Sequence, residues 1–104
     1  MKFKRFVGKS VVEVEGVPLF YLELSILESI VEFDNESTAT YGIQIEKSGF
    51  EGTRVLESGQ VDDITTCEAE IKKLARILFD GEVEPHTLPE VIFDYVDSPE
   101  YLAG

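Results

Sequence analysis

Apolar and polar side chains alternate over much of the first two thirds of the chain, and this pattern predicts β-strands. Residues 12–15 alternate valine with glutamate and run into a Gly-Val-Pro turn. Residues 40–46 show the clearest alternation, and the glycine-containing segment 47–52 separates them from a further extended stretch at 53–57. We therefore expect consecutive hairpins in an antiparallel meander sheet of about four or five strands.

Residues 20–33 fit two interpretations. Alternate positions are apolar at the start of this segment, as in a strand, but Leu22, Ile26 and Ile30 also fit the spacing of a helix. The segment is rich in β-branched and aromatic residues, and a cluster of turn-forming residues follows at 34–37. These two features favour the strand.

The apolar positions of the same segment change sides part of the way along. They are even-numbered as far as Ile26, and then include Leu27 and Val31. A change of parity inside one strand would turn its buried side outward. We therefore expect a bulge or a break near residues 25–28.

The last third of the chain has helical periodicity. A Thr-x-x-Glu capping box at Thr65 and Glu68 predicts the start of a helix, and Gly81 fits the position just past its end. One apolar stripe runs along this helix, and it consists of Cys67, Ile71, Leu74, Ala75 and Leu78.

A second helix is predicted from Thr87, which opens another Thr-x-x-Glu pattern with Pro89 in the first turn. Apolar residues keep helical spacing from Leu88 to Val96, and the Ser-Pro pair that follows ends the pattern. Residues 98–104 are expected to form a flexible C-terminal tail.

The chain has 104 residues, of which 43% are hydrophobic and 29% charged, as is typical of a globular domain. A chain of this length can bury a core without disulfides or a structural metal. We expect residues 1–97 to form a single α+β domain. Its antiparallel meander sheet is followed by two C-terminal helices that pack on one face.

The charge of the chain is unevenly distributed. Nine Lys and Arg against 21 Asp and Glu give −12; residues 1–10 carry +4, and residues 11–104 carry 5 − 21 = −16. An acidic body repels phosphate backbones and anionic lipids, so we expect no direct nucleic-acid binding and no membrane binding. The same charge favours a basic protein partner.

The compartment follows from the cysteine and from the N-terminus. Cys67 is the only cysteine, and no apolar signal core follows the basic first residues. No apolar run has the length of a membrane-spanning helix. The sequence therefore predicts a cytoplasmic protein.

Three motifs resemble one known family: Tyr-Gly-Ile-Gln-Ile at 41–45, Val-Asp-Asp-Ile-Thr at 61–65, and Pro-His-Thr-Leu-Pro-Glu-Val-Ile-Phe-Asp-Tyr at 85–95. Over about residues 40–96 the chain resembles small uncharacterised cytosolic proteins of low-GC Gram-positive bacteria, classified as a domain of unknown function. The resemblance implies one coherent bacterial domain. It implies no activity and no catalytic residue.

Few residues are candidates for catalysis. His86 is the only histidine, and we expect it to order the start of the second helix through a side-chain hydrogen bond. Cys67 lies on the apolar stripe among acidic residues, which favours a buried small hydrophobe over a nucleophile. Glycine-rich phosphate loops and zinc-binding motifs are absent from the sequence. We therefore expect no enzymatic activity, no cofactor and no metal site.

Surplus apolar side chains are the candidates for partner binding. They lie off the helical stripes or in a turn, and they are Phe50, Ile77, Phe79 and Phe93. Such a patch would bind a protein partner or a second copy of this chain in a homodimer. The basic segment 2–9 is a further candidate, pairing with the acidic body of its own chain or of a second copy.

The sequence as a whole therefore favours a non-enzymatic accessory or regulatory protein that acts through protein–protein contact. Three alternatives stay open. They are an acidic nucleic-acid mimic that binds a DNA-binding protein, a small enzyme centred on His86, and a metal-binding module.

Overall fold

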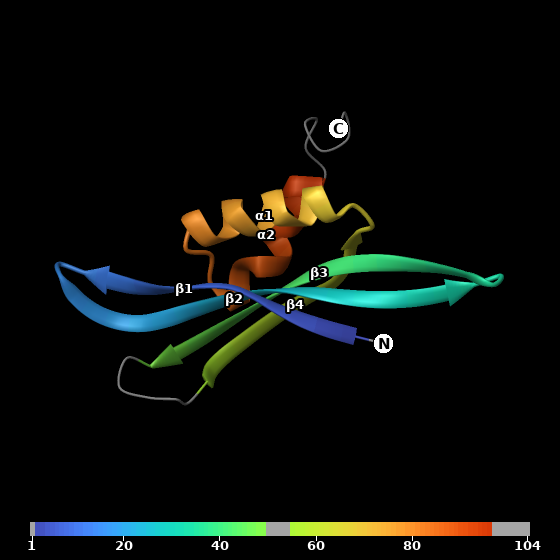
Figure 1. Ribbon diagram of the computed structural model, residues 1–104. Coiled ribbons are helices and arrows are strands. Elements are labelled where there is room, and N and C mark those ends of the chain that lie inside the picture. Colours follow the sequence, from blue (N-terminus) through green and yellow to red (C-terminus); the bar gives the residue numbers. More distant parts are fainter. Residues whose placement is uncertain (1, 50–54, 97–104) are drawn as a thin grey trace.

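The computed structural model describes residues 2–49 and 55–96, and it has two layers (Figure 1). The elements in chain order are β1 (Lys2–Val14), β2 (Val17–Phe33), β3 (Glu36–Gly49), β4 (Val55–Thr65), α1 (Glu68–Asp80), the 3₁₀ turn η1 (Pro85–Thr87) and α2 (Leu88–Val96). Four strands form one sheet in the order β1-β2-β3-β4, and each neighbouring pair is antiparallel. This arrangement confirms the predicted α+β fold.

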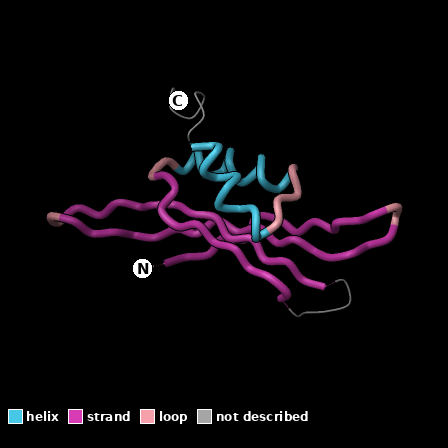
Figure 2. Tube along the Cα trace, turned by 180° about the vertical axis from the view of Figure 1, so that it is seen from behind, coloured by secondary structure: helices cyan, strands magenta, loops and turns pink. Residues whose placement is uncertain are grey.

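Two-residue turns join the first three strands, as the long hairpins of Figure 2 show. Glu15 and Gly16 connect β1 to β2, and both have positive φ. Asp34 and Asn35 do the same between β2 and β3, within the turn cluster that the sequence predicted. Positive φ at both central residues is typical of the type I′ turn, whose twist matches that of the flanking strands.

Residues 20–33 lie in strand β2, which confirms the favoured interpretation. A bulge lies beside the predicted segment 25–28, opposite Ser25, but it is not in β2 itself, whose register with β3 runs without interruption. The extra residue is instead Val7 of β1, which lies between the pairs Phe6↔Ser25 and Gly8↔Leu24. The change of apolar parity has a simpler cause: the distal part of β2 extends beyond the helices, and Val31 there is 48% exposed.

Both helices cover the same face of the sheet (Figure 1). The core between the layers is formed by branched aliphatic side chains, one buried tyrosine and one alanine. Its members are Leu22, Leu24, Ile26, Tyr41, Ile43, Ile45, Ile71, Leu74, Ala75, Leu78, Leu88 and Ile92. Apart from Cys67, the whole predicted stripe of the first helix is therefore buried, as the amphipathic pattern requires.

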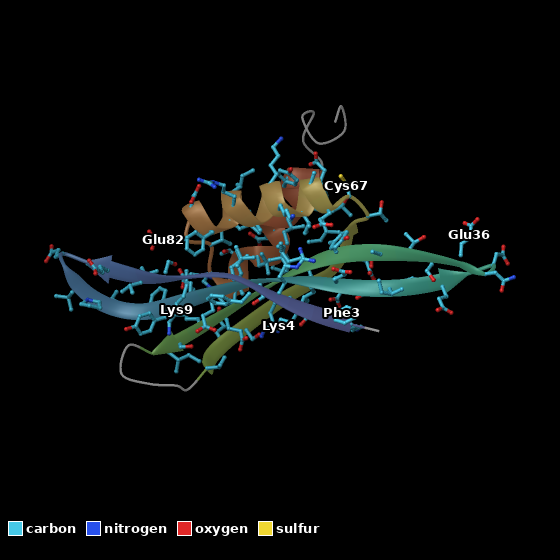
Figure 3. The ribbon with its side chains drawn as sticks, viewed as in Figure 1. Phe3, Lys4, Lys9, Glu36, Cys67 and Glu82 are labelled. Carbon is cyan, nitrogen blue, oxygen red and sulfur yellow. The ribbon has the colours of Figure 1, made fainter. Side chains whose placement is uncertain are left out.

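The start of α1 differs from the prediction. Thr65 is the last residue of β4, and its hydroxyl oxygen accepts a hydrogen bond from the Cys67 amide at 3.1 Å. Cys67 is the N-cap residue of α1, with an extended backbone and an exposed side chain. The expectation that Cys67 is buried is therefore wrong, because it precedes the first helical turn and the stripe begins at Ile71 (Figure 3).

The end of α1 is a Schellman motif. The Val83 amide donates to the Leu78 carbonyl and the Glu82 amide to the Phe79 carbonyl, both at 3.2 Å. Glu82 has the positive φ of this motif, whereas Gly81 has φ −84°. Gly81 thus lies just past the helix as predicted, but the left-handed position belongs to the next residue.

The second helix begins at Leu88, with Pro89 in its first turn as predicted. Thr87 does not act as the predicted cap. It belongs to η1, and its hydroxyl donates to the Glu84 carbonyl at 3.1 Å. The chain therefore enters α2 through a 3₁₀ turn, which places Pro85 against the sheet.

Candidate functional site in the groove between β1 and α1

A groove of about 460 Å³ separates β1 from α1. It exists because α1 packs mainly on β2 and β3, which leaves the helix-facing side of the edge strand β1 partly uncovered. Its apolar lining comprises Val7, Ile26, Ala75 and Phe79. Its charged lining comprises Arg5, Lys72, Arg76 and Asp80.

The bulge in β1 shapes this groove. Arg5 pairs with Ile26 and Gly8 pairs with Leu24, so both face the helices although three positions separate them in sequence. Val7, the extra residue, lines the groove between them. The Phe79 ring lies directly over Gly8, where an added Cβ would come within 2.7 Å of the ring. One aromatic side chain from α1 therefore closes over the backbone of β1.

The cations of the protein are concentrated on the two elements that border the groove. Strand β1 and helix α1 hold seven of the nine Lys and Arg, namely Lys2, Lys4, Arg5, Lys9, Lys72, Lys73 and Arg76. The same elements hold four acids, so together they carry 7 − 4 = +3. The remainder of the chain carries 2 − 17 = −15. The groove thus lies between two elements whose combined charge is opposite in sign to that of the remainder of the chain.

Ion pairs join the two sides of the groove at its Arg5 end. The Arg5 guanidinium lies 3.0 Å from the Glu28 carboxylate and 3.4 Å from the Glu68 carboxylate, which also lies 3.0 Å from the Lys72 ammonium. The hydrogen bond from Lys72, together with its charge and with Arg5, lowers the pKa of Glu68. Glu68 is therefore held in its charged form, where it links β1 to α1.

Tyr41 lies next to this cluster on β3, opposite Glu28, and its side chain is buried. Burial raises the pKa of the Tyr41 phenol, and the nearby Glu28 and Glu68 carboxylates raise it further. The phenol thus stays neutral beside a charged network.

Arg76 is the most accessible cation of the groove. Its side chain is 84% exposed, and its closest carboxylate, that of Asp80, is 3.9 Å away. Arg76 lies one turn beyond Lys72 on the same helix. The two cations therefore line one side of the groove, next to its apolar side chains. A ligand with both apolar and anionic groups fits this combination.

The remaining lysines of β1 lie on the open face of the sheet, and Figure 3 shows Lys4 and Lys9 on the side away from the helices. Lys4 pairs with Glu46 at 2.8 Å, and Lys9 with Glu23 at 3.6 Å. The basic segment 2–9 was predicted to pair with the acidic body of its own chain or of a second copy. These ion pairs are of the first kind, within one chain.

Of the four apolar side chains predicted to bind a partner, the three in the described part of the chain do not form one surface. Phe79 lines the groove, whereas Ile77 is exposed elsewhere on α1. Phe93 is 67% exposed on α2, in a separate shallow hollow beside Pro89 and Glu90. Phe50 lies outside the described residues. Only Phe79 therefore belongs to the groove.

His86 lies at an exposed contact between two elements. The Nδ1 atom of His86 lies 3.2 Å from the Glu57 carboxylate, and the imidazole is 59% exposed. This contact joins η1 to β4. Within residues 2–49 and 55–96, no group of three or more His, Cys, Asp or Glu side chains is placed to hold a metal ion.

Sequence reasoning missed Arg5, Val7, Lys72 and Arg76 as components of one site. The basic first segment and the spacing of Lys72 and Arg76 on one helix were visible in the sequence. Their convergence was not, because it depends on the strand order and on the bulge at Val7.

A family of unknown function, DUF6514, matches residues 4–98, so the chain belongs to this family. The match extends well beyond the segment 40–96 on which the resemblance was based. Neither the curated proteins nor the solved structures contained a match. None of the helices in the described part of the chain is both long and apolar enough to span a membrane.

Proposed function

We propose that this chain is a non-enzymatic accessory protein of the bacterial cytoplasm, and that it binds a protein partner through the groove between β1 and α1. The observation that carries the proposal is the coincidence of an apolar lining with the region of reversed charge. Apolar centres with a charged rim are typical of protein interaction surfaces. The cytoplasmic and bacterial assignments rest on the single cysteine and on the resemblance to cytosolic bacterial proteins.

The sign of the charge decides which partner the groove favours. The net charge of −12 favours a basic partner, as the sequence alone suggested. The groove itself is bordered by elements that carry +3, and Arg76 is almost fully exposed there. Contact at the groove therefore favours an acidic partner, and a basic partner would have to bind elsewhere on the chain.

The nucleic-acid mimic and the enzyme centred on His86 have less support. A mimic needs carboxylates that are free to replace phosphates, but Glu23, Glu28 and Glu46 of the sheet are paired with cations of β1. An enzyme needs several groups that converge on a substrate. The contact of His86 with Glu57 is instead an exposed pair between two elements.

The experiment is a quantitative pull-down from the native host with three tagged forms: the unmodified chain, Arg76→Glu and Lys73→Glu. Both variants change the net charge by the same amount on the same helix, but Lys73 does not line the groove. We expect a specific partner that Lys73→Glu retains and Arg76→Glu recovers about tenfold less well. Equal recovery by the two variants, or no partner above a charge-matched control protein, would contradict the proposal.

A further inference from the structure

Strand β1 is an open sheet edge along its whole length. It is the first strand in the order β1-β2-β3-β4, and no described strand pairs with its outer side. Ten of its 13 residues are exposed, and none is buried. An edge of this length presents a row of backbone N–H and C=O groups that can pair with another extended chain.

The groove lies beside this edge on the helix-facing side. A strand added to β1 would direct alternate side chains to the helix-facing side, next to Val7 and Phe79, and would bring them within reach of Arg76. Its other side chains would lie over the open face, in the neighbourhood of Lys4 and Lys9. Backbone pairing and groove contacts could thus be made by one and the same segment.

We propose that β1 binds an extended acidic segment of the partner protein as a fifth strand of the sheet. On the helix-facing side, apolar side chains of that segment occupy the groove over Val7 and Phe79, and carboxylates at other positions of the same side lie next to Lys72 and Arg76. This inference rests on the proposed function, since it names the chemistry of the partner for the same groove.

Charge decides between the acidic segment and a second copy of β1. Two β1 strands side by side would bring their Lys2, Lys4, Arg5 and Lys9 side chains together, +4 against +4. Like charges facing each other across a strand pair are destabilising. Lys4, Arg5 and Lys9 already pair with carboxylates of the same chain, but an acidic strand adds contacts to them and to Lys2, whereas a basic strand repels them.

The test is selection of peptides from a random library on the immobilised full-length chain, followed by affinity measurement on the enriched peptides. We expect enriched acidic sequences in which every second position, the helix-facing set, holds apolar residues together with Asp or Glu. Arg76→Glu should weaken their binding about tenfold, and Lys73→Glu should weaken it by about twofold or less. Both substituted residues are highly exposed, so both variants should fold.

Backbone N-methylation of an enriched peptide separates strand addition from simple groove filling. Methyl groups on the amides that face β1 should abolish binding, whereas methyl groups on the intervening amides should leave it within about threefold of the parent peptide. Laurate serves as a probe for an anionic amphiphile. If laurate displaces the peptide and both methylated forms bind equally, the groove takes an acyl chain and strand addition is wrong.

The remaining outcomes also decide the matter. Enrichment of basic peptides, equal binding to both charge variants, or no enrichment at all would overturn the fifth-strand proposal. A concentration-dependent dimer that Arg76→Glu abolishes would identify a second copy as the occupant instead. If peptides fail but the pull-down still shows the loss specific to Arg76→Glu, the groove remains a partner site and only strand addition is excluded.

Discussion

The two edges of the sheet are built in opposite ways. Strand β1 carries four Lys or Arg and one acid, whereas β4 carries three acids and no Lys or Arg. The helix-facing side of β4 is covered by η1 and α2, and the backbone of Gly59 lies against the Pro85 carbonyl. On the β1 side, the Phe79 ring lies over Gly8, and Glu68 of α1 pairs with Arg5.

Two ionic contacts strengthen the cover on the β4 side. His86 pairs with Glu57 of β4 at 3.2 Å, and Glu84 pairs with Lys47 of β3 at 3.0 Å. Ion pairs on both sides of Pro85 therefore join the start of η1 to the sheet. The two edges therefore differ in cover: η1 and α2 pack on the edge strand β4, whereas the helix-facing side of the edge strand β1 is left partly uncovered beside α1.

The largest expected effect is on the covered side. Leu88 is fully buried where α2 meets the core, so Leu88→Ala should lower the free energy of unfolding by about 3 kcal/mol. Val7 is 40% exposed in the groove, and Val7→Ala should cost less than about 1 kcal/mol. Urea denaturation measures both. Similar losses in the two variants would remove the contrast between the edges.

Replacing a glycine by alanine should also destabilise the protein more on the β4 edge than on the β1 edge. A side chain at Gly59 would meet the Pro85 backbone, which cannot move without displacing η1, so Gly59→Ala should cost about 2–3 kcal/mol. A side chain at Gly8 would meet only the Phe79 ring, which can rotate away, and Gly8→Ala should cost about 1 kcal/mol. Thermal denaturation compares the two, and a larger loss at Gly8 would contradict the proposed cover.

One substitution in the turn between α1 and η1 should increase the stability of the protein. Glu82 has a φ of 49° at the left-handed position of the Schellman motif, so Glu82→Gly should stabilise the protein by about 1 kcal/mol. Gly81→Ala is the matched control, because Gly81 has a right-handed φ that any residue can adopt. Destabilisation by Glu82→Gly would show that the turn is assigned to the wrong residue.

The smallest effect is electrostatic and lies on the β1 side. The folded pKa of Glu68 is lowered, chiefly by the hydrogen bond from Lys72, so its contribution to stability is present above the unfolded pKa and is lost as pH falls through the folded pKa. Lys72→Met should raise the pKa of Glu68 in an NMR titration, and the stability difference from the unmodified chain should shrink in acid.

Lys73→Met provides the control for that titration, because Lys73 has no part in the lowered pKa of Glu68. An unchanged Glu68 pKa in Lys72→Met, or an equal change in both variants, would show that the pairing across α1 does not control this carboxylate.

The sequence was sufficient for the features that depend on local pattern. The strand at 20–33, the turn at 34–35 and the apolar stripe from Ile71 to Leu78 all follow from periodicity and turn chemistry. The helix starts at Thr65 and Thr87 were misplaced, because each hydroxyl has a second local partner that suits a turn equally well. The local sequence alone does not show whether a threonine hydroxyl caps a helix or bonds within a turn.

The groove depended on information that one sequence does not contain. Parity in β2 suggested a bulge, but a bulge involves two strands, and here the extra residue lies in the partner β1. Phe79 was identified as a surplus aromatic, and only the position of α1 over β2 and β3 placed it against Gly8 and Val7. The cations of β1 and α1 are far apart in sequence, and only the folded structure brings them to the same groove.

Amide hydrogen exchange along both edges tests the central claim most directly, with and without an enriched acidic peptide. The account predicts that alternate amides of β1 exchange quickly in the free chain and become protected when the peptide is added, while the amides of β4 do not change. Protection that appears along β4, or around Phe93 on α2, with β1 unchanged would contradict it.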